Sequence, residues 1–137
     1  MATITAGISV TNDIASNSIS VGESFDLLKA NREDGMDTMI SVSKILTSTN
    51  QVDLITAASV STSHNYVYIN NPSANAKEFI HVGIGNAGGG TPTDTEEIGR
   101  LYGGDWMFIP WTADTNEDII VTPSTSTEMA IEYIVFS

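Results

Sequence analysis

Several short runs in this sequence contain residue types that bind nucleotides or metal ions in other proteins. The run Gly83-Ile84-Gly85-Asn86-Ala87-Gly88 has the spacing G-x-G-x-x-G and follows a predicted strand. A dinucleotide site also needs a helix that begins at once, because the helix N-terminus holds the pyrophosphate. Gly89-Gly90-Thr91-Pro92 follows instead, which is typical of a loop. We interpret the run as a flexible loop and expect no nucleotide cofactor.

The run Asp114-Thr115-Asn116-Glu117-Asp118 resembles the opening of a calcium-binding loop, D-x-N-x-D. Such a loop then needs a glycine for its sharp turn and a late bidentate glutamate. Ile119 and Thr125 occupy those two positions, which excludes the helix-loop-helix form of the site. A solvated acidic turn between two strands is the favoured interpretation. A loose surface calcium site is the alternative, and in the absence of a ligand set we assign no metal.

The residues that could catalyse a reaction do not form a recognisable set. His64 and His81 lie far apart, and neither has metal-ligand spacing to another histidine. No G-x-S-x-G elbow occurs, so no serine is nominated as a nucleophile. Four carboxylates cluster around one loop and turn, where acidic surface is the favoured interpretation: Asp94, Glu96, Glu97 and Asp105. We therefore expect a protein that is not an enzyme, with no catalytic residue and no cofactor.

The longest apolar runs lie near the end of the chain and contain both tryptophans. Trp106, Phe108 and Trp111 are candidates for stacking against a sugar or a receptor. In a small β protein such residues more often belong to the core or to a subunit interface, and we favour these roles. The final run, residues 129–136, is apolar on both faces apart from Glu132, which predicts a central strand or one at an interface.

The bulk composition limits the class of protein. The 137 residues are enough for one domain with its own core, and the lack of cysteine excludes disulfides and thiolate sites. Seventeen acidic and five basic residues give a formal net charge of −12, which opposes binding to a phosphate backbone. No apolar run reaches the length of a membrane helix, and the N-terminus lacks the pattern of a signal peptide. We expect no direct contact with nucleic acid or membrane.

The N-terminal residues alternate strictly between apolar and polar side chains. Ile4, Ile8 and Val10 fall on one face of a predicted strand over residues 2–10. The strand can be the first of the main sheet, or residues 1–22 can form an extended arm that docks on a neighbouring subunit. The second interpretation leaves residues 23–137 as the folded domain.

The rest of the chain predicts eight to ten short strands separated by turn residues. Residues 23–33 are the best helix candidate, although a strand or loop fits this short run equally well. Gly103-Gly104 lies between two apolar runs and predicts a hairpin. The spacing favours an all-β, single-domain β-sandwich or jelly roll with little helix.

Residues 65–137 resemble the small β-structured virion proteins of tailed bacteriophages. Three features carry the resemblance: an "NPS" turn, an "L-x-x-G-D" turn that leads into "IP", and a final "EY" strand. They are found in the segments 68–73 with 79–83, 98–110 and 131–136. Within that class the acidic, cysteine-free composition is similar to that of head decoration (cement) proteins.

The resemblance implies a non-enzymatic capsid decoration protein on the outer surface of a phage head. It implies a homotrimer whose partner is the major capsid protein, and whose binding clamps adjacent capsomers. The residues that we expect at the interface are Ile4, Ile8, Val10, Trp106, Phe108, Trp111, Tyr133 and Phe136. There are two alternatives. One is a phage tail or fibre component with a receptor-binding β domain. The other is a carbohydrate-binding β-sandwich module that would use Trp106 or Trp111.

Overall fold

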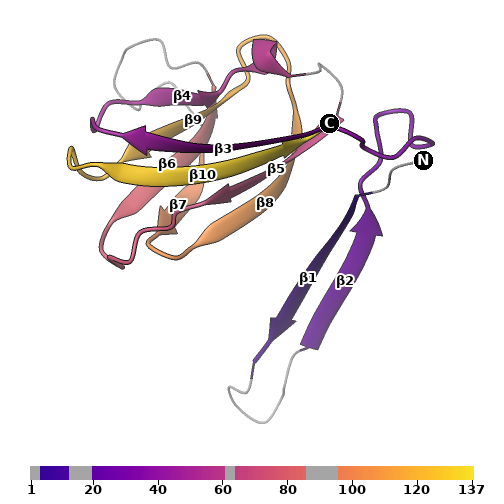
Figure 1. The fold of residues 1–137 in the computed structure, drawn as a ribbon, viewed down its shortest axis with the longest axis horizontal. Coiled ribbons are helices and arrows are strands. Elements are labelled where there is room, and N and C mark those ends of the chain that lie inside the picture. The colour runs from indigo at the N-terminus through magenta and orange to yellow at the C-terminus, as the bar shows by residue number, and fades with distance from the viewer. Residues whose placement is uncertain (1–3, 13–19, 61–63, 86–95) are drawn as a thin grey trace. The chain divides into compact units, whose positions relative to one another are not determined.

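The computed structural model describes residues 4–12, 20–60, 64–85 and 96–137, and it divides into two compact units (Figure 1). The first unit is Met1–Asp37 and the second is Thr38–Ser137. In the described part of the chain the regular structure is β, apart from one short 3₁₀ helix, Ala57–Ser59. The prediction of an all-β fold with little helix is confirmed.

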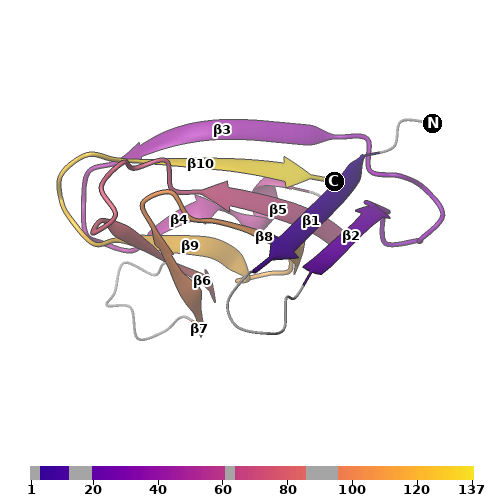
Figure 2. The ribbon, with the colours of Figure 1, turned by 90° about the horizontal axis from the view of Figure 1, so that it is seen from below.

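The second unit is a sandwich of two antiparallel four-stranded sheets. The first sheet has the strand order β3-β10-β5-β8 and the second has the order β4-β9-β6-β7. Figure 2 shows β3, β10 and β5 side by side in the first sheet. The strands are β3 (Met39–Leu46), β4 (Val52–Ile55), β5 (His64–Asn70), β6 (Phe79–Gly85), β7 (Glu96–Tyr102), β8 (Trp106–Thr112), β9 (Asp118–Pro123) and β10 (Met129–Phe136).

Successive strands of this unit alternate between the two sheets, except for β6 and β7, which are neighbours in the second sheet. Eight strands connected in this way form a jelly roll, which consists of two interleaved Greek keys. The prediction of a sandwich or jelly roll is therefore confirmed. The prediction that the last run is a central strand is also confirmed, because β10 lies between β3 and β5.

The core lies between the two sheets and consists of every second residue of the inner strands. Ile69 and Ile131 contribute from the first sheet, and Ile80 and Ile119 contribute from the second. All four side chains are fully buried. Burial of each contributes about 1.5–3 kcal/mol relative to exposure, which makes this layer the main source of stability.

The Gly103-Gly104 turn does not form the hairpin that its sequence predicts. The strand β7 belongs to the second sheet and β8 belongs to the first, so the turn carries the chain from one layer to the other. A main-chain hydrogen bond from Asp105 N to Tyr102 O closes the turn. Gly104 has a φ of 92°, which favours glycine. The two glycines correctly predict a turn, but they carry no information about which strands pair.

The first unit contains a two-stranded antiparallel hairpin, β1 (Thr5–Thr11) and β2 (Ser20–Asp26). The strand prediction for residues 2–10 is confirmed over β1, but this strand pairs with β2 and is not part of either sandwich sheet. The helix candidate at residues 23–33 is wrong and the alternative of a strand or loop is confirmed, because β2 occupies the first four of these residues and the rest are not helical. The boundary that we expected between residues 22 and 23 falls inside β2, and the two units meet at Asp37 and Thr38.

Candidate functional site

The β1–β2 hairpin has one apolar face, which the register of the two strands defines. Opposed residues of an antiparallel pair point to the same side, so each pair adds two side chains to one face. The pairs Ala6–Phe25, Ile8–Glu23 and Val10–Val21 share one side. We call this set the apolar hairpin face: Ala6, Ile8, Val10, Val21 and Phe25, with Glu23 among them.

The opposite side of the hairpin carries small and polar side chains. Its opposed pairs are Thr5–Asp26, Gly7–Ser24, Ser9–Gly22 and Thr11–Ser20. Thr5 Oγ1 donates a hydrogen bond to Asp26 Oδ1 over 2.9 Å at one end of this side. The hairpin is therefore amphipathic: one side is polar, and burial of the other, apolar side against another surface would be favourable.

Exposure of the apolar hairpin face is high. The exposed fractions are 47% for Ile8, 51% for Val10, 44% for Val21 and 44% for Phe25. A two-stranded hairpin alone is marginally stable in water, because it has no second layer to bury its apolar side. Ile8 and Val10, two of the residues expected at an interface, belong to this exposed face. Ile4 precedes β1, where its carbonyl accepts a hydrogen bond from Leu27 N.

A second group of expected interface residues lies on the outward face of the first sheet. Tyr66 and Phe108 stack with ring centroids 5.5 Å apart, and Phe108 and Phe136 follow at 6.2 Å. Tyr68 and Trp106 form a further pair with centroids 6.0 Å apart. We call these five residues the outer aromatic row. Trp106 is the most accessible of them, with 51% of its surface exposed.

Two residues that we expected at an interface point toward the core between the sheets. Trp111 is only 3% exposed and its Nε1 donates a hydrogen bond to Glu117 O over 2.9 Å. Tyr133 packs against the same core, and burial raises the pKa of its phenol. The interface assignment is wrong for Trp111, which is buried in the core, and it stays a prediction for Tyr133, which points inward but is only partly buried. The sugar-stacking alternative is likewise excluded for Trp111.

The outward face of the second sheet carries a hydrogen-bonded cluster around Glu97. His81 Nδ1 donates to Glu97 Oε1 over 2.9 Å, and Arg100 Nε lies 3.5 Å from the same oxygen. The hydrogen bond with His81 is the main reason that the pKa of Glu97 lies below its ordinary value. The guanidinium of Arg100 also lies over the ring of Phe79, 5.2 Å from its centroid.

A hollow of about 110 Å³ lies beside this cluster. Its lining comes from three strands, β6, β7 and β9, and from the residue before β4: Gln51, His81, Val82, Gly83, Glu97, Ile120 and Thr122. His81, Glu97 and Thr122 place polar groups at the rim of a site whose floor is Gly83 and Ile120. Sequence reasoning missed this site because β6, β7 and β9 are brought together only by the sheet order.

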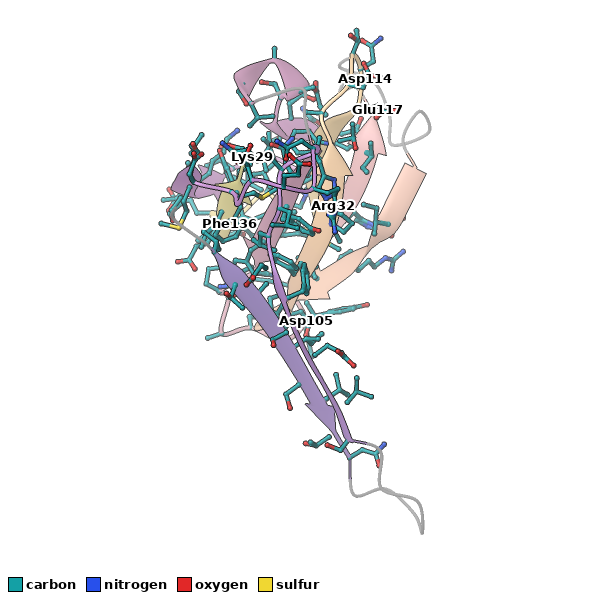
Figure 3. All side chains as sticks on the ribbon, turned by 90° about the vertical axis from the view of Figure 1, so that its right-hand side faces the viewer. Lys29, Arg32, Asp105, Asp114, Glu117 and Phe136 are labelled. Carbon is teal, nitrogen blue, oxygen red and sulfur yellow. The ribbon has the colours of Figure 1, made fainter. Side chains whose placement is uncertain are left out.

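The other sequence motifs do not form sites in the described residues. Gly83, Ile84 and Gly85 end β6, while residues 86–88 of the glycine motif and Asp94 lie outside the described residues. Asp114 and Glu117, labelled in Figure 3, lie at the turn between β8 and β9. Asp114 Oδ1 accepts a hydrogen bond from Thr115 N, and Asp118 Oδ1 accepts one from Ala57 N, so these carboxylates hold the local backbone. His64 contacts the ring of Tyr66 edge-on.

The described residues offer neither a metal-binding cluster nor a helix that could span a membrane. No group of three or more histidine or acidic side chains is placed to hold a metal ion there. No helix among the same residues has the length and apolar character needed to cross a membrane. Asp105 of the expected acidic cluster accepts a hydrogen bond from Tyr102 N and closes the turn before β8.

Comparison with known proteins adds little to this picture. The sequence matches no protein-family model, and no curated protein is similar to it. The crystal structure of the Yersinia pseudotuberculosis-derived mitogen (YPM) shows a partial likeness, with a TM-score of 0.43 and 13% sequence identity. The match covers 72% of this chain and 85% of that chain. A likeness at this level carries no argument about function.

Proposed function

We propose that this protein is a non-enzymatic structural component of a larger assembly, and that it docks through its β1–β2 hairpin. The observation that carries the proposal is the exposed apolar hairpin face on a ribbon that pairs with neither sandwich sheet. The resemblance of residues 65–137 to small virion proteins of tailed phages suggests the assembly. The protein then decorates the outer surface of a phage head as a homotrimer, with the major capsid protein as its partner.

The energetics of the hairpin favour a repetitive partner. Full burial of one such side chain contributes about 1.5–3 kcal/mol, and about half of that remains available in Ile8, Val10, Val21 and Phe25. The four together supply about 4 kcal/mol, which corresponds to a dissociation constant near 1 mM before the entropy of association is subtracted. One hairpin therefore binds weakly. Three hairpins on a trimer, or many copies on a shell, reach useful avidity without any new contact.

The charge of the molecule fits this role. A net charge of −12 disfavours contact with packaged nucleic acid and keeps free subunits apart before they reach their partner. The apolar hairpin face carries a single ionised residue, Glu23, so this surface is the least repulsive part of the hairpin toward another protein.

The test is co-sedimentation of the purified full chain with DNA-free expanded phage heads, preceded by a native mass measurement. The double variant Ile8→Thr and Val10→Thr keeps β propensity but removes the apolar surface. We expect it to lose at least tenfold in head binding. The matched control changes the polar side of the same strand, with Ser9→Thr and Thr11→Ser, and is expected to bind like the wild type.

A trimer that pellets with heads and depends on Ile8 and Val10 supports the proposal. Full head binding by the double variant would show that the hairpin is not the docking element. A trimer that ignores heads would favour the alternative of a tail or fibre component with a receptor-binding β domain.

A second candidate function is carbohydrate binding, and the placement of Trp106 favours it. Its exposed indole lies beside Tyr68 on the outward face of the first sheet, as in surfaces on which aromatic rings stack against a sugar. Trp111 is buried, so any change of tryptophan fluorescence caused by a glycan reports on Trp106. Glycan-dependent quenching in the wild type that disappears in Trp106→Phe supports this function, and quenching that persists in that variant contradicts it.

A further inference from the structure

The hollow beside Glu97 lies on the outward face of the second sheet, whereas the outer aromatic row lies on the first sheet. Along β6 and β9 its residues alternate with those of the core. His81 and Gly83 flank the core residue Val82, and Ile120 and Thr122 flank the core residue Val121. This placement makes the hollow a feature of the sheet surface, independent of the docking function proposed above.

The polar side of the hollow is held in place before any ligand binds. Glu97 Oε1 is fixed by His81 Nδ1 and faces the guanidinium of Arg100. Within the described residues, the two groups that approach this carboxylate both contact Oε1, so Oε2 is the oxygen that we expect to accept from a ligand. Thr122 stands opposite His81 in the sheet register and adds a hydroxyl to the same rim.

The floor of the hollow is apolar. Gly83 contributes backbone without a side chain, and Ile120, directly opposite it in the register, is a branched hydrocarbon with only 1% of its surface exposed. Phe79 extends this apolar surface beyond His81, because its ring contacts the His81 ring edge-on with centroids 5.1 Å apart. A ligand that fits must combine hydroxyl groups for the rim with C–H groups for the floor.

Size and charge narrow the class of ligand. About 110 Å³ is below the range of about 300–1,000 Å³ that holds a drug-sized molecule, so the site suits one small ring. The ionised Glu97 and the net charge of −12 oppose anions. A carboxylate oxygen accepts well from alcohol groups, and the hydrocarbon floor suits the C–H face of a pyranose ring.

We propose that this hollow binds a hydroxyl-bearing face of a neutral monosaccharide unit, with Glu97 as the principal acceptor. Thr122 and Nε2 of His81 supply further hydrogen bonds, and the ring of Phe79 contacts the C–H groups. A single ring of this size binds with a dissociation constant in the millimolar range, near 1 mM. Useful affinity then requires several copies of the site on one assembly.

The test uses the two histidines of the chain as reporters. The ring signals of His64 and His81 are assigned in ¹H–¹³C NMR spectra with the variants His64→Gln and His81→Gln. The full-length protein is then titrated with the methyl glycosides of glucose, galactose and mannose and with N-acetylglucosamine, each to about 50 mM, well above the expected dissociation constant. We expect a saturable shift of the His81 signals with at least one sugar and no saturable shift of the His64 signals.

The variant Glu97→Gln keeps the size of the side chain and removes its charge. We expect it to weaken sugar binding by about tenfold or more, as for the loss of a hydrogen bond to a charged group. Unchanged His64 signals in this variant show that the fold is retained. No His81 shift with any of the four sugars, or equal affinity in Glu97→Gln, overturns the proposal. Quenching of Trp106 without a His81 shift places the sugar on the first sheet and also overturns it.

Discussion

The side-chain amide of Asn71 donates a hydrogen bond to the main-chain carbonyl of Leu101 over 3.0 Å, although the two residues are 30 positions apart. Both residues are buried. The Asn71 side-chain oxygen accepts from Ser73 N, while the Asn71 backbone pairs with Asp105 O and Gly104 N. The turn after β5 and the turn before β8 are therefore locked together. These are the same "NPS" and "L-x-x-G-D" turns that carry the resemblance to virion proteins.

Replacing Asn71 should destabilise the sandwich markedly. Asn71→Ala leaves the buried carbonyl of Leu101 and the partly buried N–H of Ser73 without their partners. Loss of the partner of a buried polar group costs about 1–3 kcal/mol. We expect the midpoint of urea unfolding to fall accordingly. Asn70→Ala is the control, because its side chain bonds Glu132 in an exposed position and should cost less than about 1 kcal/mol. Equal effects of the two variants would contradict the role given to Asn71.

Gly103 is required by close packing of the same two turns. A Cβ at this position would lie 2.4 Å from Asn75 O and 2.7 Å from Ser73 O, and both are backbone atoms. Gly103→Ala should therefore lower stability by about 1–3 kcal/mol through forced backbone shifts. Gly99→Ala should be neutral or stabilising by up to about 1 kcal/mol, because nothing lies within 4 Å of a Cβ there. Urea unfolding of both variants measures the contrast, and a neutral Gly103→Ala would refute the packing argument.

The two tryptophans should behave oppositely in solution. Trp111→Phe removes the hydrogen bond to Glu117 O and leaves a void between the sheets, so we expect a loss of about 1–3 kcal/mol. Trp106→Phe should change stability by less than about 0.5 kcal/mol, because its side chain is half exposed. Fluorescence gives a second measurement: iodide should quench the emission that remains in Trp111→Phe and spare the emission that remains in Trp106→Phe. Equal quenching in both variants would contradict the burial of Trp111.

The ionisation of Glu97 should depend on His81. The hydrogen bond with His81 lowers the pKa of Glu97 from its ordinary value of 4.5, and the positive charge of Arg100 acts in the same direction. A lowered pKa in the folded state favours the carboxylate, so its contribution to stability is present above about pH 4.5 and is lost as pH falls through the folded pKa. Carbonyl-detected NMR titration should show the Glu97 midpoint rising toward 4.5 in His81→Gln. An unchanged midpoint would show that the hydrogen bond does not set this pKa.

Alternating apolar and polar side chains made most strands predictable from the sequence. The pairing between strands could not be predicted in this way. The runs that became β3, β5, β6 and β10 show strong β propensity, and local sequence is sufficient to find them. Their assignment to sheets depends on contacts between residues far apart in the sequence. The Gly103-Gly104 signal is local, so it predicted a hairpin between two strands that belong to different sheets. Residues 23–33 suggested a helix because Phe25 and Leu28 are three apart, but pairing with β1 overrode this weak preference.

The sites were less predictable than the fold, with one exception. The alternation rule applied to β8 separates Trp106 and Phe108 from Trp111, because even and odd positions of a strand point to opposite faces. That signal was present in the sequence and would have assigned Trp111 to the core. The apolar hairpin face needs the register of β1 against β2, and the hollow at Glu97 needs the order of the second sheet. No local pattern contains either piece of information.

The place of β10 in the first sheet also governs how the chain folds during its synthesis. The strand β10 lies between β3 and β5, so the first sheet has a gap at its centre until Phe136 has left the ribosome. The β1–β2 hairpin is formed by strands that are close in sequence, so it can form early. Until β10 is available, the incomplete sandwich exposes unpaired strand edges. A nascent chain of this protein should therefore depend on holding chaperones until its last strand emerges, and premature termination within β10 should give aggregates instead of a shortened domain.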